Sequence, residues 1–180
     1  MRIRQRQRIG AAFSLALGTL WLAAAAPVPR QAPAFAFADA DGKQMQLASF
    51  KGKVVVVELL LTRCPHCWRV AQTLARLQGE LGARGFQPIS IAFDNDASGP
   101  LVRNFAGRAK IAYPVGYAAA GQVDAFLGRE EKERFQVPQL VVIDRAGVIR
   151  AKSLPVGETR LEDEASLRRL VDGLLKEPGP

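Results

Sequence analysis

Two cysteines are the residues of this chain whose type and spacing most directly imply chemistry. They frame the motif Cys64-Pro65-His66-Cys67 and are the only cysteines in the sequence. An apolar run of strand length, 54–61, precedes them, and apolar residues at helical spacing follow. We therefore expect Cys64 at the start of a helix and Cys67 one turn later, on the buried face. Two thiols placed in this way can form and break disulfides by exchange.

The predicted helix start favours a thiolate at Cys64. The first turn of a helix presents unpaired N–H groups and the positive end of the helix dipole, and both stabilise an anion. Arg63 and His66 flank the same sulfur and act in the same direction, and Pro65 suits the first helical position. We expect Cys64 to be the nucleophile and Cys67 to be the thiol that resolves a mixed disulfide.

Three other interpretations of the motif are weaker. A structural disulfide between residues three apart closes a small loop with little entropic gain. A structural zinc site takes four Cys or His ligands, whereas this chain has two cysteines and one histidine, so only a metal shared between two chains stays open. Two inert core cysteines do not account for the order of strand, motif and helix.

The elements that must position the cysteines alternate along the chain. Strands are expected at 34–37, 54–61, 87–93, 140–143 and 148–153, and helices after Cys64, at 100–108, at 122–127 and across 161–175. Interleaved strands and helices, followed by a hairpin and a last helix, indicate an α/β sandwich with a mixed sheet. The motif would then lie at the carboxyl end of a central strand, where α/β sheets usually carry their sites.

The amino terminus has the pattern of an export segment. Four arginines within the first eight residues precede an uncharged apolar run, 9–26, that ends in small residues. Residues 1–26 are therefore expected to be a signal peptide or, since the run approaches the length of a membrane span, an N-terminal membrane anchor. A Pro/Ala linker at 27–33 and one domain at 34–177 would follow. Export would place the dithiol in a compartment where disulfides persist.

The charge of the chain excludes one class of partner. The formal net charge is +8, and the four leader arginines account for half of it. The remaining basic residues are scattered along the chain, so we expect no nucleic acid partner.

Glu58 is an acid within the apolar strand that leads to the cysteines. A buried carboxylate is costly unless it is paired, and burial raises its pKa towards the range useful for general acid–base catalysis. The functional interpretation is that Glu58 takes the proton of Cys67 when Cys67 attacks. The alternative is a structural ion pair with a basic residue such as Lys53.

Several motifs together resemble the TlpA/ResA branch of exported thiol–disulfide oxidoreductases, in the thioredoxin superfamily. They are the lead-in from Phe35 through Phe50-Lys51-Gly52-Lys53 to the valine run, the Cys64–Cys67 motif, and Val137-Pro138-Gln139 before 140–144. The resemblance implies a thioredoxin-like three-layer sandwich with a mixed central sheet, an extra N-terminal hairpin and a strand–helix insertion. It also implies a cis peptide at Pro138, although X–Pro bonds are usually trans, and a Val137 backbone that binds the client segment.

The chain also departs from this family. Arg63 stands where the family commonly has tryptophan, Trp68 follows the second cysteine, and Leu60 stands at another aromatic position. The Pro-His dipeptide is similar to that of periplasmic disulfide oxidases, so a disulfide-forming oxidase is the alternative to the expected protein-disulfide reductase. A thiol peroxidase is disfavoured because Leu61 replaces the Thr or Ser usual in that class. A non-catalytic assembly factor is a further alternative.

The resemblance also implies which partners to expect. Clients would be cysteine-containing proteins, with apocytochrome c as a family-level candidate. Electrons would come from a membrane or thioredoxin-type donor, and no cofactor or metal is implied.

Overall fold

The computed structural model of the chain describes residues 28–129, 136–153 and 159–179. The export segment expected at 1–26 lies outside these residues. No helix in the described ranges is both long and apolar enough to cross a membrane.

A mixed sheet of eight strands forms the middle of the described structure, in the order β1-β8-β7-β4-β5-β6-β2-β3. The strands are β1 (Arg30–Gln31), β2 (Ala36–Asp39), β3 (Gln44–Gln46), β4 (Val54–Leu60), β5 (Phe86–Ala92), β6 (Val115–Tyr117), β7 (Gln139–Ile143) and β8 (Val148–Lys152). Strand β4 pairs in parallel with β5 and antiparallel with β7, and every residue of β4 is buried. A strand that is apolar apart from Glu58 suits this central position because helices cover it on both faces.

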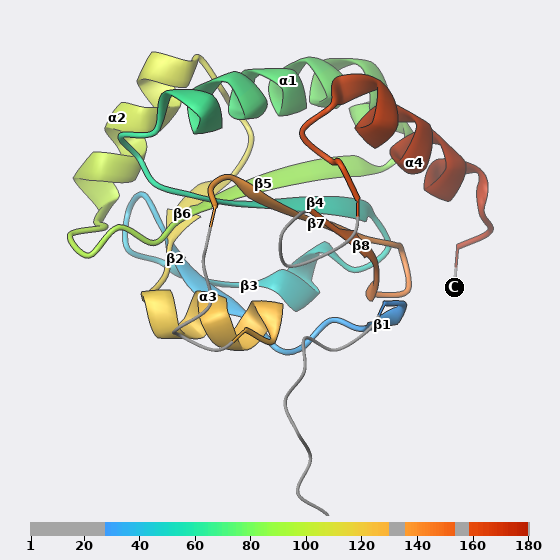
Figure 1. Cartoon of the computed structure of the whole chain (residues 1–180), viewed down its shortest axis with the longest axis horizontal. Helices are drawn as coiled ribbons and strands as arrows, with labels where there is room; N and C mark the ends of the chain where they lie inside the picture. The colour runs from blue at the N-terminus through green and yellow to red at the C-terminus, as the bar shows by residue number, and fades with distance from the viewer. Residues whose placement is uncertain (1–27, 130–135, 154–158, 180) are drawn as a thin grey trace, which may run out of the picture.

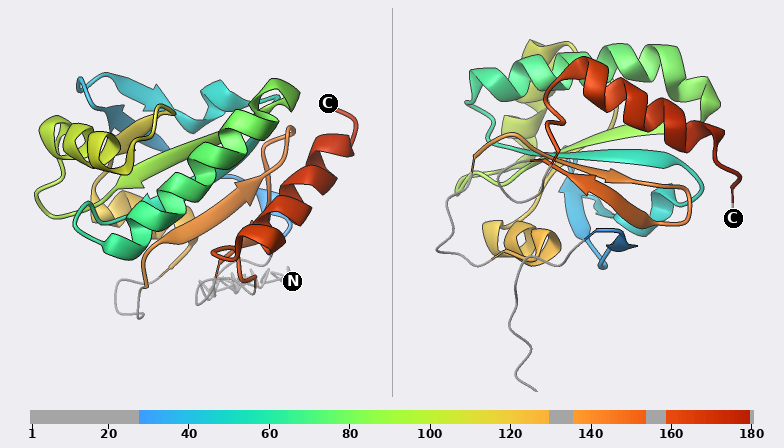
Figure 2. Two further views of the ribbon diagram at one scale, coloured as in Figure 1. Left: turned by 90° about the horizontal axis from the view of Figure 1, so that it is seen from above. Right: turned by 45° about the vertical axis from the view of Figure 1, so that its right-hand side comes forward.

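Helices cover the two faces unequally (Figure 1). Helices α1 (Pro65–Leu81), α2 (Gly99–Ala109) and α4 (Glu164–Lys176) lie on one face, and α3 (Ala120–Leu127) lies on the other. Helices α1 and α4 run side by side across the sheet (Figure 2), and ion pairs such as Arg76–Glu164 and Glu80–Arg168 join them. The architecture is the expected thioredoxin-like three-layer sandwich, with β2–β3 as the extra hairpin and β6–α3 within the insertion.

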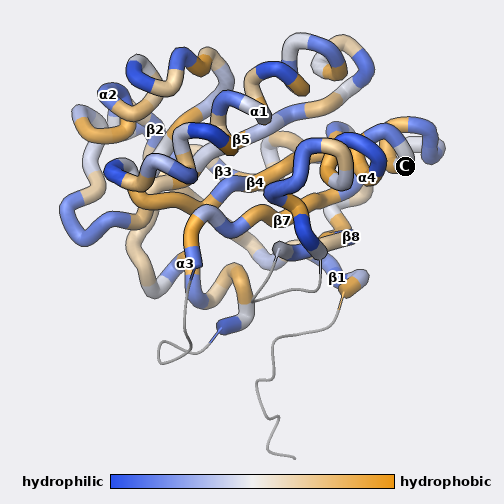
Figure 3. Tube along the Cα trace, turned by 45° about the horizontal axis from the view of Figure 1, so that its top comes forward, coloured by the Kyte–Doolittle hydropathy of each residue, from blue (hydrophilic) through white to orange (hydrophobic). Residues whose placement is uncertain are grey.

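Two apolar cores separate these layers. One core packs α1, α2 and α4 against the sheet, and the other packs α3 and the short 3-10 helix η1 (Leu47–Phe50) against the opposite face. In α1, apolar residues from Cys67 to Leu81 recur every three or four positions and are buried. Figure 3 shows hydrophobic colour along the central strands and hydrophilic colour on the outer turns of the helices. This packing places the first turn of α1 at the carboxyl end of β4.

The structure differs from the sequence-based boundaries at a few points. Strand β1 lies within the segment expected to be a linker, and it pairs with β8 through Arg30 and Gln31. Strand β2 begins at Ala36, whereas the sequence predicts a strand from residue 34. The last helix is expected to begin at Leu161, which is buried but precedes the start of α4 at Glu164. Strand pairing and core contacts, which are not local in sequence, set these boundaries.

Candidate active site

The two cysteines lie one helical turn apart at the carboxyl end of β4. Cys64 is the N-cap of α1 and is partly exposed, whereas Cys67 is completely buried, and both are free thiols. The Cys67 N–H donates a hydrogen bond to Cys64 Sγ at 3.3 Å. Pro65 occupies the first turn, where its missing N–H leaves no hydrogen bond unmade. The placement expected from the motif is thus the one observed, with an accessible sulfur at a positive helix end.

The peptide at Thr62, two residues before Cys64, is fixed from both sides. Asp94, which follows β5, accepts hydrogen bonds from Thr62 N (2.9 Å) and Thr62 Oγ1 (3.1 Å). On the other side, Trp68 Nε1 donates to Thr62 O at 2.9 Å. The Arg108 guanidinium lies 4.1 Å from the centre of the Trp68 ring. Trp68 is recognisable in the sequence as a departure from the family, but its contact with the cysteine loop, like that of Asp94, depends on tertiary structure.

The two residues expected to stabilise the Cys64 thiolate differ in their surroundings. Arg63 donates two hydrogen bonds to Asp96, at 3.1 and 2.7 Å, and lies 3.8 Å from Asp94. These two carboxylates partly neutralise the positive charge of Arg63, which reduces its electrostatic effect on Cys64 Sγ. His66 is exposed in the first turn of α1.

Glu58 lies in the middle of β4 and is completely buried. Its Oε2 accepts a hydrogen bond from Ser90 Oγ at 2.5 Å, and its Oε1 has no hydrogen-bond partner among the described residues. Burial raises the pKa of Glu58 to about 8, an effect that the Ser90 hydrogen bond partly offsets. Lys53, the ion-pair partner considered from the sequence, instead donates to Gln87. The structural ion pair with Lys53 is therefore absent.

The thiol of Cys67 is held in its neutral form. Burial raises the pKa of Cys67 far above its usual range, and the hydrogen bond with Cys64 and the charge of Glu58 raise it further. A thiol in this state needs a base before it can attack a disulfide. Glu58 is close enough to act electrostatically on that thiol.

Ser90 and Tyr113 were not identified from the sequence as part of the site. Ser90 is a completely buried hydroxyl in β5, at the register position opposite Glu58, and its Oγ lies 3.0 Å from Tyr113 Oη. The available signal was one polar residue between two isoleucines in an apolar strand. Strand order, which places β5 beside β4, gives that residue its partner.

The Val137–Pro138 peptide is cis, as the family resemblance implies. Pro138 is buried and precedes β7, which pairs directly with β4. Val137 is partly exposed and packs, as Cys64 does, against the core beneath α1.

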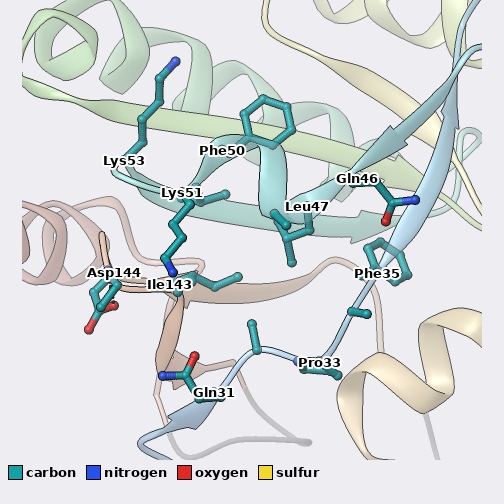
Figure 4. Close-up of a pocket in the computed structure, with 16 residues that line it drawn as sticks. Gln31, Pro33, Phe35, Gln46, Leu47, Phe50, Lys51, Lys53, Ile143 and Asp144 are labelled. Carbon is teal, nitrogen blue, oxygen red and sulfur yellow. Dashed lines mark hydrogen bonds between the residues drawn. The ribbon is translucent and has the colours of Figure 1, made fainter. Parts of the chain in front are cut away.

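Two hollows bear on where a client could lie. The cavity in Figure 4, of about 220 Å³, is lined by residues that include Phe35, Phe50 and Ile143. It lies at the amino end of β4, one strand length or roughly 20 Å from the cysteines, so the dithiol does not open into it. An open hollow whose lining includes Leu61, Arg63 and Phe93 lies instead directly beside the cysteine loop.

Comparisons with known proteins agree with this arrangement. The Redoxin family model matches residues 27–171. A thiol:disulfide interchange protein of the thioredoxin family from Chlorobium tepidum TLS is 30% identical, with a TM-score of 0.67, covering 84% of this chain and 99% of its own. No curated protein matches the chain.

Two further solved structures share the fold. A Chlorobium tepidum protein that carries the name thiol:disulfide interchange protein DsbE is 22% identical, with a TM-score of 0.67, covering 82% of this chain and 96% of its own. A thiol:disulfide interchange protein from Bacteroides sp. is 21% identical, with a TM-score of 0.66, covering 83% and 93%. Because the family model spans most of a chain that carries a dithiol at a helix start, the chain belongs to the Redoxin family and is a thioredoxin-like thiol–disulfide oxidoreductase.

Proposed function

We propose that the protein is an extracytoplasmic protein-disulfide reductase that works by dithiol exchange through Cys64 and Cys67. The observation that carries the proposal is the unequal exposure of the two sulfurs within one helical turn. The partly exposed Cys64 is accessible to a client, whereas Cys67 is buried beside it. That asymmetry suits a nucleophile and a resolving thiol.

The reaction proceeds in two exchanges. The Cys64 thiolate attacks a client disulfide, a Cys64–client bond forms, and one client thiolate leaves. Cys67 then gives its proton to ionised Glu58 and attacks Cys64 Sγ, which forms the Cys64–Cys67 disulfide and releases the second client thiolate. With a pKa of about 8, Glu58 is ionised in about a tenth of the molecules at pH 7, and a base with a pKa near the working pH is well suited to this transfer.

The client segment would lie beside Cys64 and against Val137 and Pro138. Val137 offers backbone groups next to β7, and the hollow beside the cysteine loop offers apolar surface from Leu61 and Phe93. Cysteine-containing proteins are the client class, with apocytochrome c a candidate that rests on family resemblance. The donor that reduces the enzyme again would be a membrane or thioredoxin-type dithiol.

The proposed location rests on the amino terminus and on relatives. Four arginines followed by an apolar run at 9–26 have the pattern of a signal peptide or anchor. The similar structures named for thiol:disulfide interchange, including DsbE, add support for an exported protein.

The reduction potential of the Cys64–Cys67 pair tests the direction of electron flow. The full chain is equilibrated in glutathione or dithiothreitol buffers, with insulin reduction as the activity readout and C64S as the inactive control. A potential near that of thioredoxin, about −270 mV, supports a reductase. A potential near about −120 mV, with the Cys64 thiolate persisting at acidic pH, would identify the alternative, a disulfide-forming oxidase, and overturn the proposal.

A further inference from the structure

A buried chain of hydroxyl groups connects Glu58 to helix α1. Ser90 Oγ lies 2.5 Å from Glu58 Oε2 and 3.0 Å from Tyr113 Oη. Tyr113 Oη lies 3.2 Å from the carbonyl oxygen of Ala71, one turn of α1 beyond Cys67. Both hydroxyl-bearing residues are buried, so the path from β4 through β5 to α1 is enclosed by protein.

The number of hydrogens shared among these hydrogen-bonded groups depends on whether Glu58 is ionised or neutral. When Glu58 is ionised, Ser90 donates to the carboxylate, and the single Tyr113 hydrogen is donated either to Ser90 or to the carbonyl oxygen of Ala71, so one of the three contacts carries no hydrogen. When Oε2 carries a proton, Glu58 donates to Ser90, Ser90 to Tyr113 and Tyr113 to Ala71, so all three contacts are hydrogen bonds. Only the neutral state fills all three contacts, and the direction of donation between Ser90 and Glu58 is opposite in the two states.

Few other titratable groups near Glu58 can affect its protonation. In the described structure the titratable groups that act on or respond to its charge are Cys67 on α1 and Tyr113 before β6. Strands β5 and β7 place the uncharged Ser90 and Leu140 beside it. Burial raises the pKa of Tyr113, and the Glu58 charge raises it further, so the phenol stays protonated and can donate.

We propose that Ser90 and Tyr113 are positioning residues for Glu58. The Ser90 hydroxyl binds Oε2 and leaves Oε1 available to accept the Cys67 proton. Rotation of the carboxyl group then presents the protonated oxygen to Ser90, so that Ser90 accepts from Glu58 and donates to Tyr113. The carboxylate accepts the Cys67 proton, the Cys67 thiolate attacks Cys64, and no other proton acceptor is needed within the core. This inference rests on the acid–base role assigned above to Glu58.

The test follows the Glu58 carboxyl directly. The full-length reduced protein, labelled with ¹³C at the glutamate side-chain carboxyl carbon, is titrated by NMR from pH 5 to 10, with E58Q identifying the resonance. The midpoint should be near 8 in the wild type. S90A should move the midpoint up by about one pH unit, because the carboxylate loses its charged hydrogen bond. Y113F should move it down by about half a unit, because the neutral acid loses two hydrogen bonds and the anion loses one.

The matched variants separate positioning from general packing. S90T keeps the hydroxyl and should restore a midpoint close to the wild type, and Y117F, which alters the other tyrosine of the chain, should leave it unchanged. Shifts of the same sign in S90A and Y113F, or shifts no larger than that of Y117F, would overturn the inference.

A wild-type measurement does not depend on the folding of any variant. The ¹³Cζ resonance of Tyr113 should change at the same midpoint as Glu58, because Tyr113 accepts a hydrogen bond from Ser90 only when Glu58 is neutral. A Tyr113 signal that is constant through that midpoint would also overturn the inference. Because these titrations need no turnover, they are independent of the insulin assay, whose failure would refute the proposed function alone.

Discussion

Replacing Glu58 by glutamine should make the protein more stable, by an amount that grows with pH. Glu58 is completely buried and has a folded-state pKa of about 8, against an ordinary value of 4.5. Between these values the folded protein keeps a proton that the unfolded chain has lost. The free energy of unfolding therefore decreases as pH rises, by about 1.4 kcal/mol per pH unit for this one group.

The magnitude follows from that window. The contribution of neutral Glu58 to the free energy of unfolding is fully present below pH 4.5. This contribution is lower by about 3 kcal/mol at pH 7 and by roughly 5 kcal/mol once the pH exceeds 8. Glutamine has a similar shape and does not ionise, so E58Q lacks this loss. At pH 4 the two proteins should agree within about 1.5 kcal/mol, the range of one rearranged hydrogen bond.

Urea unfolding followed by circular dichroism measures the difference. Wild type and E58Q are compared between pH 4 and 9 as full-length reduced proteins in a non-thiol reductant. The control is E80Q, which changes an acid on the outer surface of α1 that pairs with Arg168. The difference between E80Q and the wild type should stay small at every pH. If the advantage of E58Q is constant, or if wild type gains on E58Q as pH rises, Glu58 is stabilised as an anion in the fold and the reasoning fails.

Four further substitutions test the cysteine loop. C67S should accumulate a mixed disulfide with a client peptide, whereas C64S should form none, as seen by mass spectrometry under non-reducing conditions; equal trapping by both variants would contradict the assigned roles. D94N should lower the free energy of unfolding by about 1–3 kcal/mol and change the reduction potential, because the loop at Thr62 loses a charged acceptor; an unchanged potential would show that this loop does not position the dithiol. W68F keeps an aromatic ring but loses the donor to Thr62 O, so the free energy of unfolding should fall by about 1 kcal/mol. A larger decrease in urea titrations would show that packing of the indole ring contributes more than this hydrogen bond.

The chemistry of this protein was readable from local sequence. The spacing of Cys64 and Cys67, the apolar strand before them and the helical periodicity after them are properties of adjacent residues. Such patterns predict a strand, a helix and a buried or exposed face without knowledge of distant contacts. The acid within the apolar strand, Glu58, was recognisable for the same reason, since a charge in a buried run is unusual.

The surroundings of those residues depended on tertiary structure. Ser90 becomes the partner of Glu58 because β5 pairs with β4 in a register that no local pattern determines. In the same way, Asp94 reaches Thr62 across 32 positions of sequence, and Tyr113 reaches Ala71 across 42. The Lys53 ion pair, considered from the sequence as the alternative role of Glu58, is not formed, because Lys53 donates to Gln87 and Glu58 is bonded by Ser90 instead. The sequence thus determines which groups can react, and the packing of distant strands determines how readily Glu58 and Cys67 give up their protons.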